Sequence, residues 1–250
     1  GGTVPANAEA RIRSAGARFI HRNTHLGIAA VETSAALDDA SAIKALRAQP
    51  GVAYVVHDRV VSAERLHLKL APSTFSVVIG QKSPAPYDTY YTSTPQGWAV
   101  QQVGGYGDNV PGGPAHGPWD ITQGKGVRIA VLDSGVDENH PDIAPNLALN
   151  MTEVDRTAYP SPCDDGSPED QSGHGTWTAS LAAGAMGPGT GLVIGVAPQA
   201  TILNIKVLER MPALMNGASL SDECEAGQAS GLLSWVLQGI DDAITNHADV

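Results

Sequence analysis

The apolar pattern of the first sixty residues changes its period within a short stretch. The segments "ARFIH" and "GIAAVET" are brief apolar runs typical of strands, and Val52–Val56 ("VAYVV") is a third strand candidate. Between them, apolar residues recur at helical spacing over residues 37–46, and a Pro-Gly pair follows as a stop signal. This part of the chain is predicted to form a small α/β unit.

Longer apolar runs alternate with helical patterns in the second half of the chain. Residues 126–133 ("GVRIAVLD") and 200–208 ("ATILNIKVL") contain few polar positions, as expected of strands covered on both faces of a parallel sheet. Residues 230–248 predict a helix with Asp241 and Asp242 off its apolar face. That face is formed by Leu233, Val236, Leu237, Ile240 and Ile244. The prediction is an α/β fold around a parallel sheet, and we expect the chain to stop inside this domain because a new strand begins at its last residues.

The two patterns are separated by a stretch without clear periodicity. Residues 62–98 are rich in Pro, Tyr, Ser and Thr, which is typical of a connecting segment. We therefore divide the chain into a first domain at 1–62, a linker and processing region at 63–98, and a second domain at 99–250.

Composition narrows the functional classes. A hydrophobic content of 42% supports a buried core, and 16% charged residues with 28 Gly and 17 Pro fit a loop-rich secreted protein. The net charge of −11 offers no basic face for nucleic acid. No run approaches the roughly 18 apolar residues that span a bilayer. We expect neither a nucleic-acid partner nor a membrane span.

The cysteines and the first residues say little about function. Cys163 and Cys224 are too few for a disulfide framework and lack metal-ligand spacing, and a disulfide between them stays open here. The chain begins without Met and without an apolar signal segment, so we expect it to be truncated or processed.

Asp133 and His174 are the candidate chemical groups. Asp133 follows an apolar strand, at the carboxyl end where α/β sheets place functional groups, although a simple turn aspartate would look the same. His174 starts a predicted helix, where the dipole disfavours ring protonation, and its neighbours Gly173 and Gly175 are expected to admit a substrate chain. A buried structural histidine is the alternative. Together the two residues suit the orienting and proton-transferring pair of a nucleophilic hydrolase, in the order Asp before His.

Three motifs in this order resemble one family. The stretches "AVLDSGVD" with the following "HPD", then "SGHGT", then "GVAPQATILNIKVL" resemble the N-terminal half of the catalytic domain of subtilisin-like serine peptidases. The resemblance implies an incomplete subtilisin-like domain in which Asp133 and His174 belong to the catalytic triad, with protein or peptide substrates. It also places four residues where the substrate side chains before the scissile bond are bound: Leu208, Gly231, Leu233 and Val236.

The first domain resembles the propeptide of the same family. The resemblance covers residues 36–61 ("ALDDASAIKALRAQPGVAYVVHDRVV"), with Asp58 as the nearby acid. It implies a secreted zymogen whose ferredoxin-like α/β propeptide assists folding and acts as an intramolecular inhibitor. An unrelated ferredoxin-like module is the alternative.

The resemblance implies no cofactor for the chemistry and leaves a structural calcium open. The family's tight calcium site takes a Gln near the mature N-terminus, matched by Gln101 or more suitably Gln102, and the Asp of the "HPD" motif, here Asp142. The loop 184–195 lacks the usual Asn, and a hard cation would need several more oxygen ligands.

The serines after His174 are poorly suited to complete a triad. Ser180 lies six residues further along the same predicted helix, about 9 Å away by helical rise and on another face. The later serines lack the small-residue turn that exposes a nucleophile: Ser219, Ser221, Ser230 and Ser234. We therefore expect the nucleophile beyond Val250, in an endopeptidase of which these 250 residues alone are inactive.

Two other classes fit parts of the pattern. A pseudoprotease or propeptide-type inhibitor would bind polypeptides without cleaving them. A metal-dependent hydrolase would use zinc or manganese, although no His pair has helix spacing. Its ligands would come from Asp133, Asp137, His140, Asp142 and His174.

Overall fold

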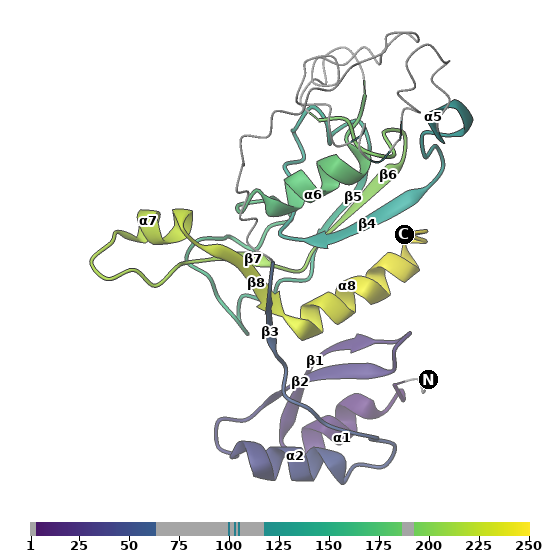
Figure 1. Cartoon of the computed structure of the whole chain (residues 1–250). Helices are drawn as coiled ribbons and strands as arrows, with labels where there is room; N and C mark the ends of the chain where they lie inside the picture. The colour runs from purple at the N-terminus through teal and green to yellow at the C-terminus, as the bar shows by residue number, and fades with distance from the viewer. Residues whose placement is uncertain (1–3, 64–99, 101–102, 104, 106–117, 187–192) are drawn as a thin grey trace.

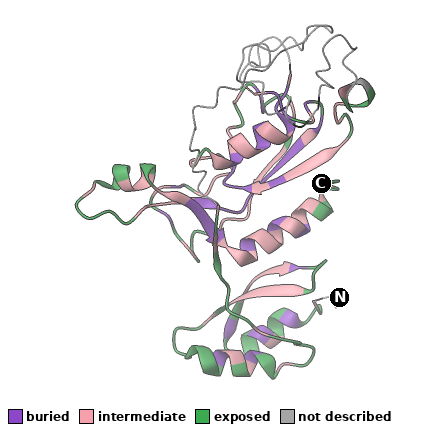
Figure 2. Cartoon of the chain, in the orientation of Figure 1, coloured by how far each residue is buried: buried purple, intermediate pink, exposed green. Residues whose placement is uncertain are grey.

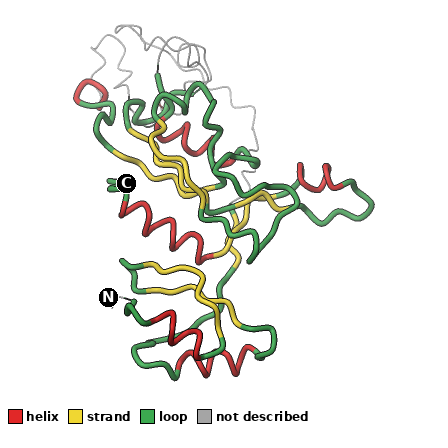
Figure 3. Tube along the Cα trace, turned by 180° about the vertical axis from the view of Figure 1, so that it is seen from behind, coloured by secondary structure: helices red, strands yellow, loops and turns green. Residues whose placement is uncertain are grey.

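The computed structural model describes residues 4–63, 100, 103, 105, 118–186 and 193–250 of the chain. A small N-terminal unit lies at one end of the molecule and a parallel sheet at the other (Figure 1). Helix α8 (Leu233–Thr245) lies between them, and the view from behind shows the same stacking (Figure 3). The long helix of the second half therefore contacts both parts of the chain.

The N-terminal unit is an antiparallel two-stranded sheet covered on one face by two helices. Its elements are α1 (Ala8–Ser14), β1 (Ala17–Asn23), β2 (Ile28–Thr33) and α2 (Asp39–Arg47). The Asp38 carboxylate caps α2 by accepting a hydrogen bond from Ser41 N at 3.0 Å. Ile12 and Leu46 are buried in the small core beneath the sheet. The predicted helix and the first two predicted strands are confirmed.

The third predicted strand is wrong. Residues 52–56 form no regular element, and the side chains of Val52, Tyr54 and Val56 are exposed. Strand β3 (Val60–Ser62) forms instead, where β8 (Gln228–Leu232) offers it an antiparallel partner. The ferredoxin-like description of this unit is not confirmed, because within residues 4–63 its own sheet has two strands.

The second half contains the predicted parallel sheet. Its strands are β4 (Arg128–Asp133), β5 (Leu147–Thr152) and β6 (Thr201–Lys206), in the order β4-β6-β5. All pairs are parallel, and the register places Asp133 beside Lys206 at the carboxyl ends. The α/β fold around a parallel sheet is confirmed.

Helices cover both faces of this sheet, as its apolar strands require. Val131 and Ile202 face α6 (His174–Ala183), whereas Leu132 and Ile205 face α8. The middle strand β6 is the most buried part of the molecule (Figure 2), and each of its large apolar side chains contributes about 1.5–3 kcal/mol by leaving water. The sheet is therefore a rigid support for whatever its carboxyl edge carries.

A second, antiparallel sheet lies beyond that edge. β8 is its middle strand, with β3 on one side and β7 (Glu209–Met211) on the other. Between β7 and β8 the chain makes an excursion that projects from the body and contains α7 (Leu220–Glu225) (Figure 1). This excursion is a surface feature between two strands of the antiparallel sheet.

The N-terminal unit packs on α8 through the outer face of its sheet. His21 Nε2 lies 3.1 Å from Ser234 O, and Asn23 Nδ2 donates to Leu237 O. The Asp241 carboxylate accepts from His25 N at 2.9 Å and contacts His25 Nδ1 at 2.6 Å. Asp241 was correctly placed off the apolar face, but it is buried, because the N-terminal unit covers the side of α8 on which it lies.

The last residues lie alongside β4. Val250 N donates to Arg128 O at 3.2 Å and Ala130 N donates to Val250 O at 2.8 Å, which is a parallel pairing. The strand predicted to begin at these residues therefore pairs as expected. In the parts of the chain that the structure describes, no helix is both long and apolar enough to cross a membrane.

Candidate active site

Asp133 is fixed at the carboxyl end of β4. Its side chain is almost fully buried, and Ser134 N donates to Asp133 Oδ1 at 2.7 Å. Its backbone oxygen accepts from Val207 N at 2.9 Å and from Leu208 N at 3.1 Å. The strand end and its carboxylate are thus held by the segment that leads out of β6.

His174 is the first residue of α6 and meets Asp133 directly. Its Nδ1 lies 2.8 Å from Asp133 Oδ1 and 2.9 Å from Asp133 Oδ2. An ionised carboxylate only accepts hydrogen bonds, so this contact places the ring proton on Nδ1 and leaves the Nε2 lone pair free. The His174 side chain is 26% exposed, so the ring is not sealed inside the protein. The two candidates from the sequence are therefore brought together.

Glycine is required on each side of His174 for a different structural reason. Gly173 caps α6 with φ of 87°, a left-handed conformation that glycine adopts without strain, and its α-carbon faces open space. Gly175 is buried, and a Cβ there would lie 2.1 Å from Gly135 O. The expectation that both glycines admit a substrate is wrong for Gly175, whose small size brings α6 against the turn that follows Asp133.

The four candidate substrate-binding residues all lie around the segment 59–63. Gly231 pairs with Val61 across β3 and β8, and Leu233 N donates to Arg59 O at 2.7 Å. Leu208 and Val236 belong to the apolar cluster into which Val61 packs. The structure therefore places a strand of this same chain where the sequence predicts a substrate.

The side chains predicted as metal ligands are not seen to come together around one point in the described residues. Asp142 is fully buried and its Oδ2 accepts from Val193 N at 2.7 Å, while Gln101 and Gln102 lie outside the described residues. His140 Nδ1 is 3.9 Å from Asp142 Oδ2. Among the described residues, no group of three or more His, Cys, Asp or Glu side chains is placed to hold a metal. The proposed zinc or manganese ligands are therefore not gathered into one group in the described part of the chain, and the calcium expectation stays a prediction.

A buried polar cluster lies behind the loop 161–171 and was not foreseen. Lys206 Nζ is 2.9 Å from both oxygens of Asp164 and donates to Glu169 O and Gln171 Oε1, each at 2.8 Å. The Lys206 and Asp164 side chains have no exposed area. The one sequence signal was a lysine inside the apolar strand "ILNIKV", because such a lysine needs a buried partner.

Glu209 belongs to the same cluster but has no hydrogen-bond partner among the residues that the structure describes. Both of its side-chain oxygens are buried without a hydrogen bond in the described part of the chain. Burial and the nearby Asp164 carboxylate raise the pKa of Glu209 to about 7, against the opposing effect of Arg156 and Lys206. This carboxyl group therefore changes charge near neutral pH.

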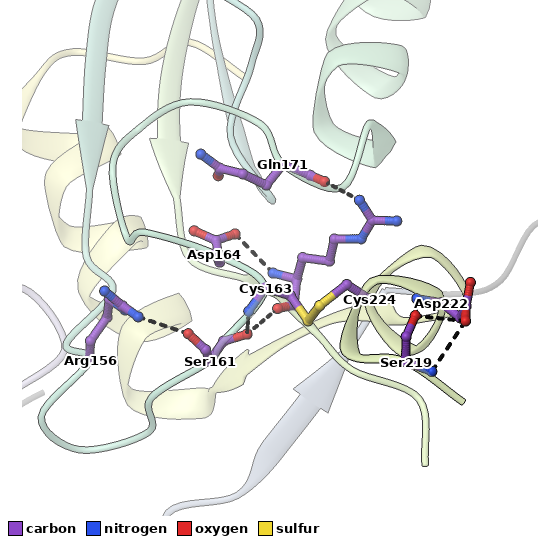
Figure 4. The surroundings of a disulfide bond; sticks show 9 residues. Arg156, Ser161, Cys163, Asp164, Gln171, Ser219, Asp222 and Cys224 are labelled. Carbon is purple, nitrogen blue, oxygen red and sulfur yellow. Dashed lines mark hydrogen bonds between the residues drawn. A yellow bond between two sulfur atoms is a disulfide. The ribbon is translucent and has the colours of Figure 1, made fainter. Parts of the chain in front are cut away.

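A disulfide joins this loop to the projecting excursion. Cys163 and Cys224 are bonded, with α-carbons 5.4 Å apart and a sequence separation of 61. Figure 4 shows the bond between the loop that carries Ser161 and Asp164 and the helix that carries Cys224. The disulfide that the sequence left open is present, and it anchors the base of the excursion.

The fold and the site together define a class of enzyme. A parallel-sheet α/β protein with an Asp–His pair at the carboxyl edge has the arrangement of hydrolases that use a triad in the order Asp, His, nucleophile. The chain belongs to the subtilase family, because the model of the Subtilase family matches residues 124–250, half of the chain.

Individual relatives agree with this membership. The chain is 35% identical to thermitase of Thermoactinomyces vulgaris over 126 residues, which are 48% of this chain and 40% of that protein. It is 29% identical to subtilisin E of Bacillus subtilis (strain 168) over 220 residues, 88% of this chain and 41% of that protein. The chain thus spans about two fifths of these relatives' lengths. A solved structure of the MycP3 protease from the type VII (ESX-3) secretion system matches 68% of this chain and 37% of its own, at 21% identity and a TM-score of 0.37.

Proposed function

We propose that the complete protein is a subtilisin-like serine endopeptidase that hydrolyses peptide bonds in protein or peptide substrates. The observation that carries the proposal is the contact of His174 Nδ1 with both oxygens of Asp133, at 2.8 and 2.9 Å. It is supported by membership of the subtilase family.

The proposed chemistry assigns one role to each side chain. His174 Nε2 takes the proton of the attacking serine hydroxyl and later gives it to the leaving amine. Asp133 holds the ring in the tautomer that leaves Nε2 free and stabilises the imidazolium that forms. We assign no step to a metal or a cofactor.

The serine nucleophile is proposed to lie beyond Val250. Ser180 is buried and lies six residues along the same helix as His174, about 9 Å away by helical rise, so its hydroxyl does not reach the ring. Within the described ranges, no serine hydroxyl is hydrogen-bonded to His174 Nε2. The 250-residue chain is therefore proposed to be inactive, and its partner residues in catalysis to come from a longer chain.

The N-terminal part is proposed to be a propeptide that inhibits its own enzyme. The division is the one expected from sequence, with a propeptide at 1–62, a processing region at 63–98 and the catalytic part at 99–250. Two contacts support it: β3 pairs with β8 beside the candidate site, and Asp58 Oδ1 accepts from Ser234 N at 3.0 Å at the start of α8. The Cys163–Cys224 disulfide supports a secreted protein, since such bonds persist in oxidising compartments.

Labelling with a fluorophosphonate, which reacts with activated serines, tests the proposal. The 250-residue chain should stay unlabelled, whereas a chain extended through the full length of its relatives should be labelled once per molecule. His174→Ala in the extended chain should slow labelling by about 10³-fold or more. His247→Asn is the matched control, because Asn tolerates the left-handed backbone at that position (φ of 55°) and should leave the rate unchanged.

The same experiment tests the remaining parts of the proposal. Val61→Asp should speed the first labelling event, because a charge in the apolar cluster on β8 weakens the inhibitory strand. Stoichiometric labelling of the 250-residue chain would refute the position of the nucleophile. A folded extended chain that is never labelled would instead favour the pseudoprotease or inhibitor, which binds polypeptides without cleaving them.

A further inference from the structure

We propose that Asp170 is a positioning residue for the Asp133–His174 pair: it acts through the backbone and Ser134 to set how far the imidazole lies from its carboxylate. This inference rests on the proposed function, since it concerns the same pair. It assigns a role to a residue in the loop before His174 that touches neither the ring nor the substrate.

The Asp170 carboxylate is saturated with hydrogen-bond donors from one short stretch. Its Oδ1 accepts from Ser172 N at 2.9 Å and from Gly173 N at 2.8 Å. Its Oδ2 accepts from Thr176 N at 2.8 Å and from Thr176 Oγ1 at 2.7 Å. These four bonds tie the residues on both sides of His174 to one rigid group, so the start of α6 cannot move independently of Asp170.

The fifth donor comes from the other side of the site. Ser134 Oγ donates to Asp170 Oδ1 at 2.9 Å and accepts from Gly175 N at 2.9 Å. Ser134 N in turn donates to Asp133 Oδ1 at 2.7 Å. An unbroken chain of contacts therefore runs from Asp170 through Ser134 to the carboxylate that receives the His174 proton.

A second contact closes the same arrangement. Thr176 Oγ1, which donates to Asp170, accepts from Asp137 N at 2.9 Å. The turn after β4 and the first turn of α6 are thus joined at two points, through Ser134 and through Thr176. Both points depend on the Asp170 carboxylate, because it orients the two hydroxyl groups.

The Asn variant of Asp170 isolates this role. Asn keeps the shape and one accepting oxygen, but its NH₂ group must then face donors, either at Ser172 and Gly173 or at Thr176. With the NH₂ group facing Ser172 and Gly173, both backbone bonds are lost; with it facing Thr176, the bond from Thr176 N is lost and the Thr176 hydroxyl must accept instead of donate. In either orientation, at least one of the bonds that fix the start of α6 is lost. Small displacements matter here, since a misplacement of about 1 Å in a catalytic group can cost about 100-fold in rate.

Nuclear magnetic resonance of the 250-residue chain reads the geometry without any need for catalysis. The Nδ1 proton of an imidazole bonded to a carboxylate resonates far downfield, and Asp133→Asn should abolish the signal of His174. Asp170→Asn should broaden or remove this signal while the backbone amide spectrum outside residues 133–137 and 170–176 stays the same. Asp165→Asn is the matched control in the same loop, because Asp165 is exposed and its carboxylate accepts from Ser167 N at 2.9 Å and Gln171 Nε2 at 3.1 Å but from none of the groups bonded to Asp170.

The outcomes separate this inference from the function on which it rests. A signal that depends on Asp133 but is unchanged in Asp170→Asn overturns the role of Asp170 alone. A folded chain whose downfield signal ignores Asp133→Asn overturns the Asp–His pair, and the role of Asp170 falls with it. Should Asp170→Asn fail to fold, Ser134→Ala keeps the four loop bonds and is read in its place: faster solvent exchange of the His174 proton supports the inference, and unchanged exchange overturns it.

The extended, active chain gives a second readout. Asp170→Asn should lower kcat by about 10- to 100-fold with KM nearly unchanged. The reason is that the substitution does not touch β8, beside which the substrate is predicted to bind. A change in KM alone would place Asp170 in substrate binding and contradict a positioning role.

Discussion

The carboxylates on the two sides of the loop 161–171 differ in burial and in the kind of group that they bond to. On the side of His174, Asp170 is partly exposed and accepts five hydrogen bonds from neutral N–H and O–H donors. On the far side, Asp164 and Glu209 are buried around one amine, that of Lys206. Neutral donors fix positions without adding charge. The buried Lys206 amine instead pairs with the Asp164 carboxylate and leaves Glu209 without a hydrogen-bond partner in the described chain.

This difference indicates what each side does. The exposed network orients the two side chains to which we assign proton transfer, so its effects should appear in geometry and rate. The buried cluster joins β6, β7 and the loop into one body, so its effects should appear in the free energy of unfolding. Changes on the buried side test that division.

Removing the buried amine should have the largest effect. Lys206→Met leaves Asp164 buried and without its counter-ion, and we expect a loss of about 3–5 kcal/mol in the free energy of unfolding. Urea unfolding followed by far-UV circular dichroism measures it. If the buried cluster does not hold the loop, the loss will be below about 1 kcal/mol.

Two controls sharpen the result for Lys206. Lys125→Met removes an exposed lysine and should change the unfolding free energy by less than about 0.5 kcal/mol. The double variant Lys206→Met with Asp164→Leu should recover part of the loss, because an apolar pair no longer contains an unpaired charge. Recovery is incomplete, since Asp164 Oδ2 also accepts from Arg210 N at 2.9 Å.

Removing the disulfide should have the next largest effect. The double variant Cys163→Ser, Cys224→Ser opens a link across 61 residues, which we expect to cost about 2–4 kcal/mol by freeing the unfolded chain. Thermal unfolding with and without dithiothreitol measures it. The reductant should lower the midpoint of the native chain to that of the variant and leave the variant unchanged. A native midpoint that ignores the reductant would mean that the bond does not hold the buried side.

The spacing of apolar residues was enough to predict most of the regular core of this fold. The apolar runs ending at Asp133 and Leu208 predicted two of the three parallel strands, β4 and β6 but not β5, and the start of α6 at His174 was predicted as well. The pattern failed at Val52–Val56, where β-branched residues suggested a strand but no strand of the described residues pairs with it. A strand needs a partner, and partners are set by the tertiary fold rather than by local sequence.

The residues of the candidate site likewise differ in whether local sequence could predict them. Asp133 and His174 could be predicted because each stands at the end of an element with a recognisable pattern. Asp170 could not, because its importance lies in which donors the folded loop points at it. Lys206 and Glu209 were likewise hidden in strand sequences, since only the packing of loop 161–171 decides which charge finds a partner.

The smallest expected effect concerns Glu209, the buried carboxyl group that is not hydrogen-bonded to the Lys206 amine. The pKa of Glu209 is raised from 4.5 to about 7 in the folded protein, so the fold favours its neutral form. The stability that comes from binding this proton is fully present below about pH 4.5 and is lost as the pH rises through about 7. Above pH 7 the folded protein carries a buried charge without a hydrogen-bond partner in the described chain.

Glu209→Gln, which mimics the neutral acid, should therefore stabilise the protein only at the higher pH. We expect no difference from the native chain at pH 4.5 and a gain of about 1–3 kcal/mol at pH 8, measured by urea unfolding at both values. Glu153, whose pKa burial and Asp242 also raise to about 7, titrates in both proteins and cancels in the comparison. Glu225→Gln, an exposed change on α7, controls for the loss of one negative charge and should show no such pH dependence. No gain at pH 8 would mean that neighbouring groups stabilise the Glu209 charge after all, and that the carboxylates on both sides of the loop are paired alike.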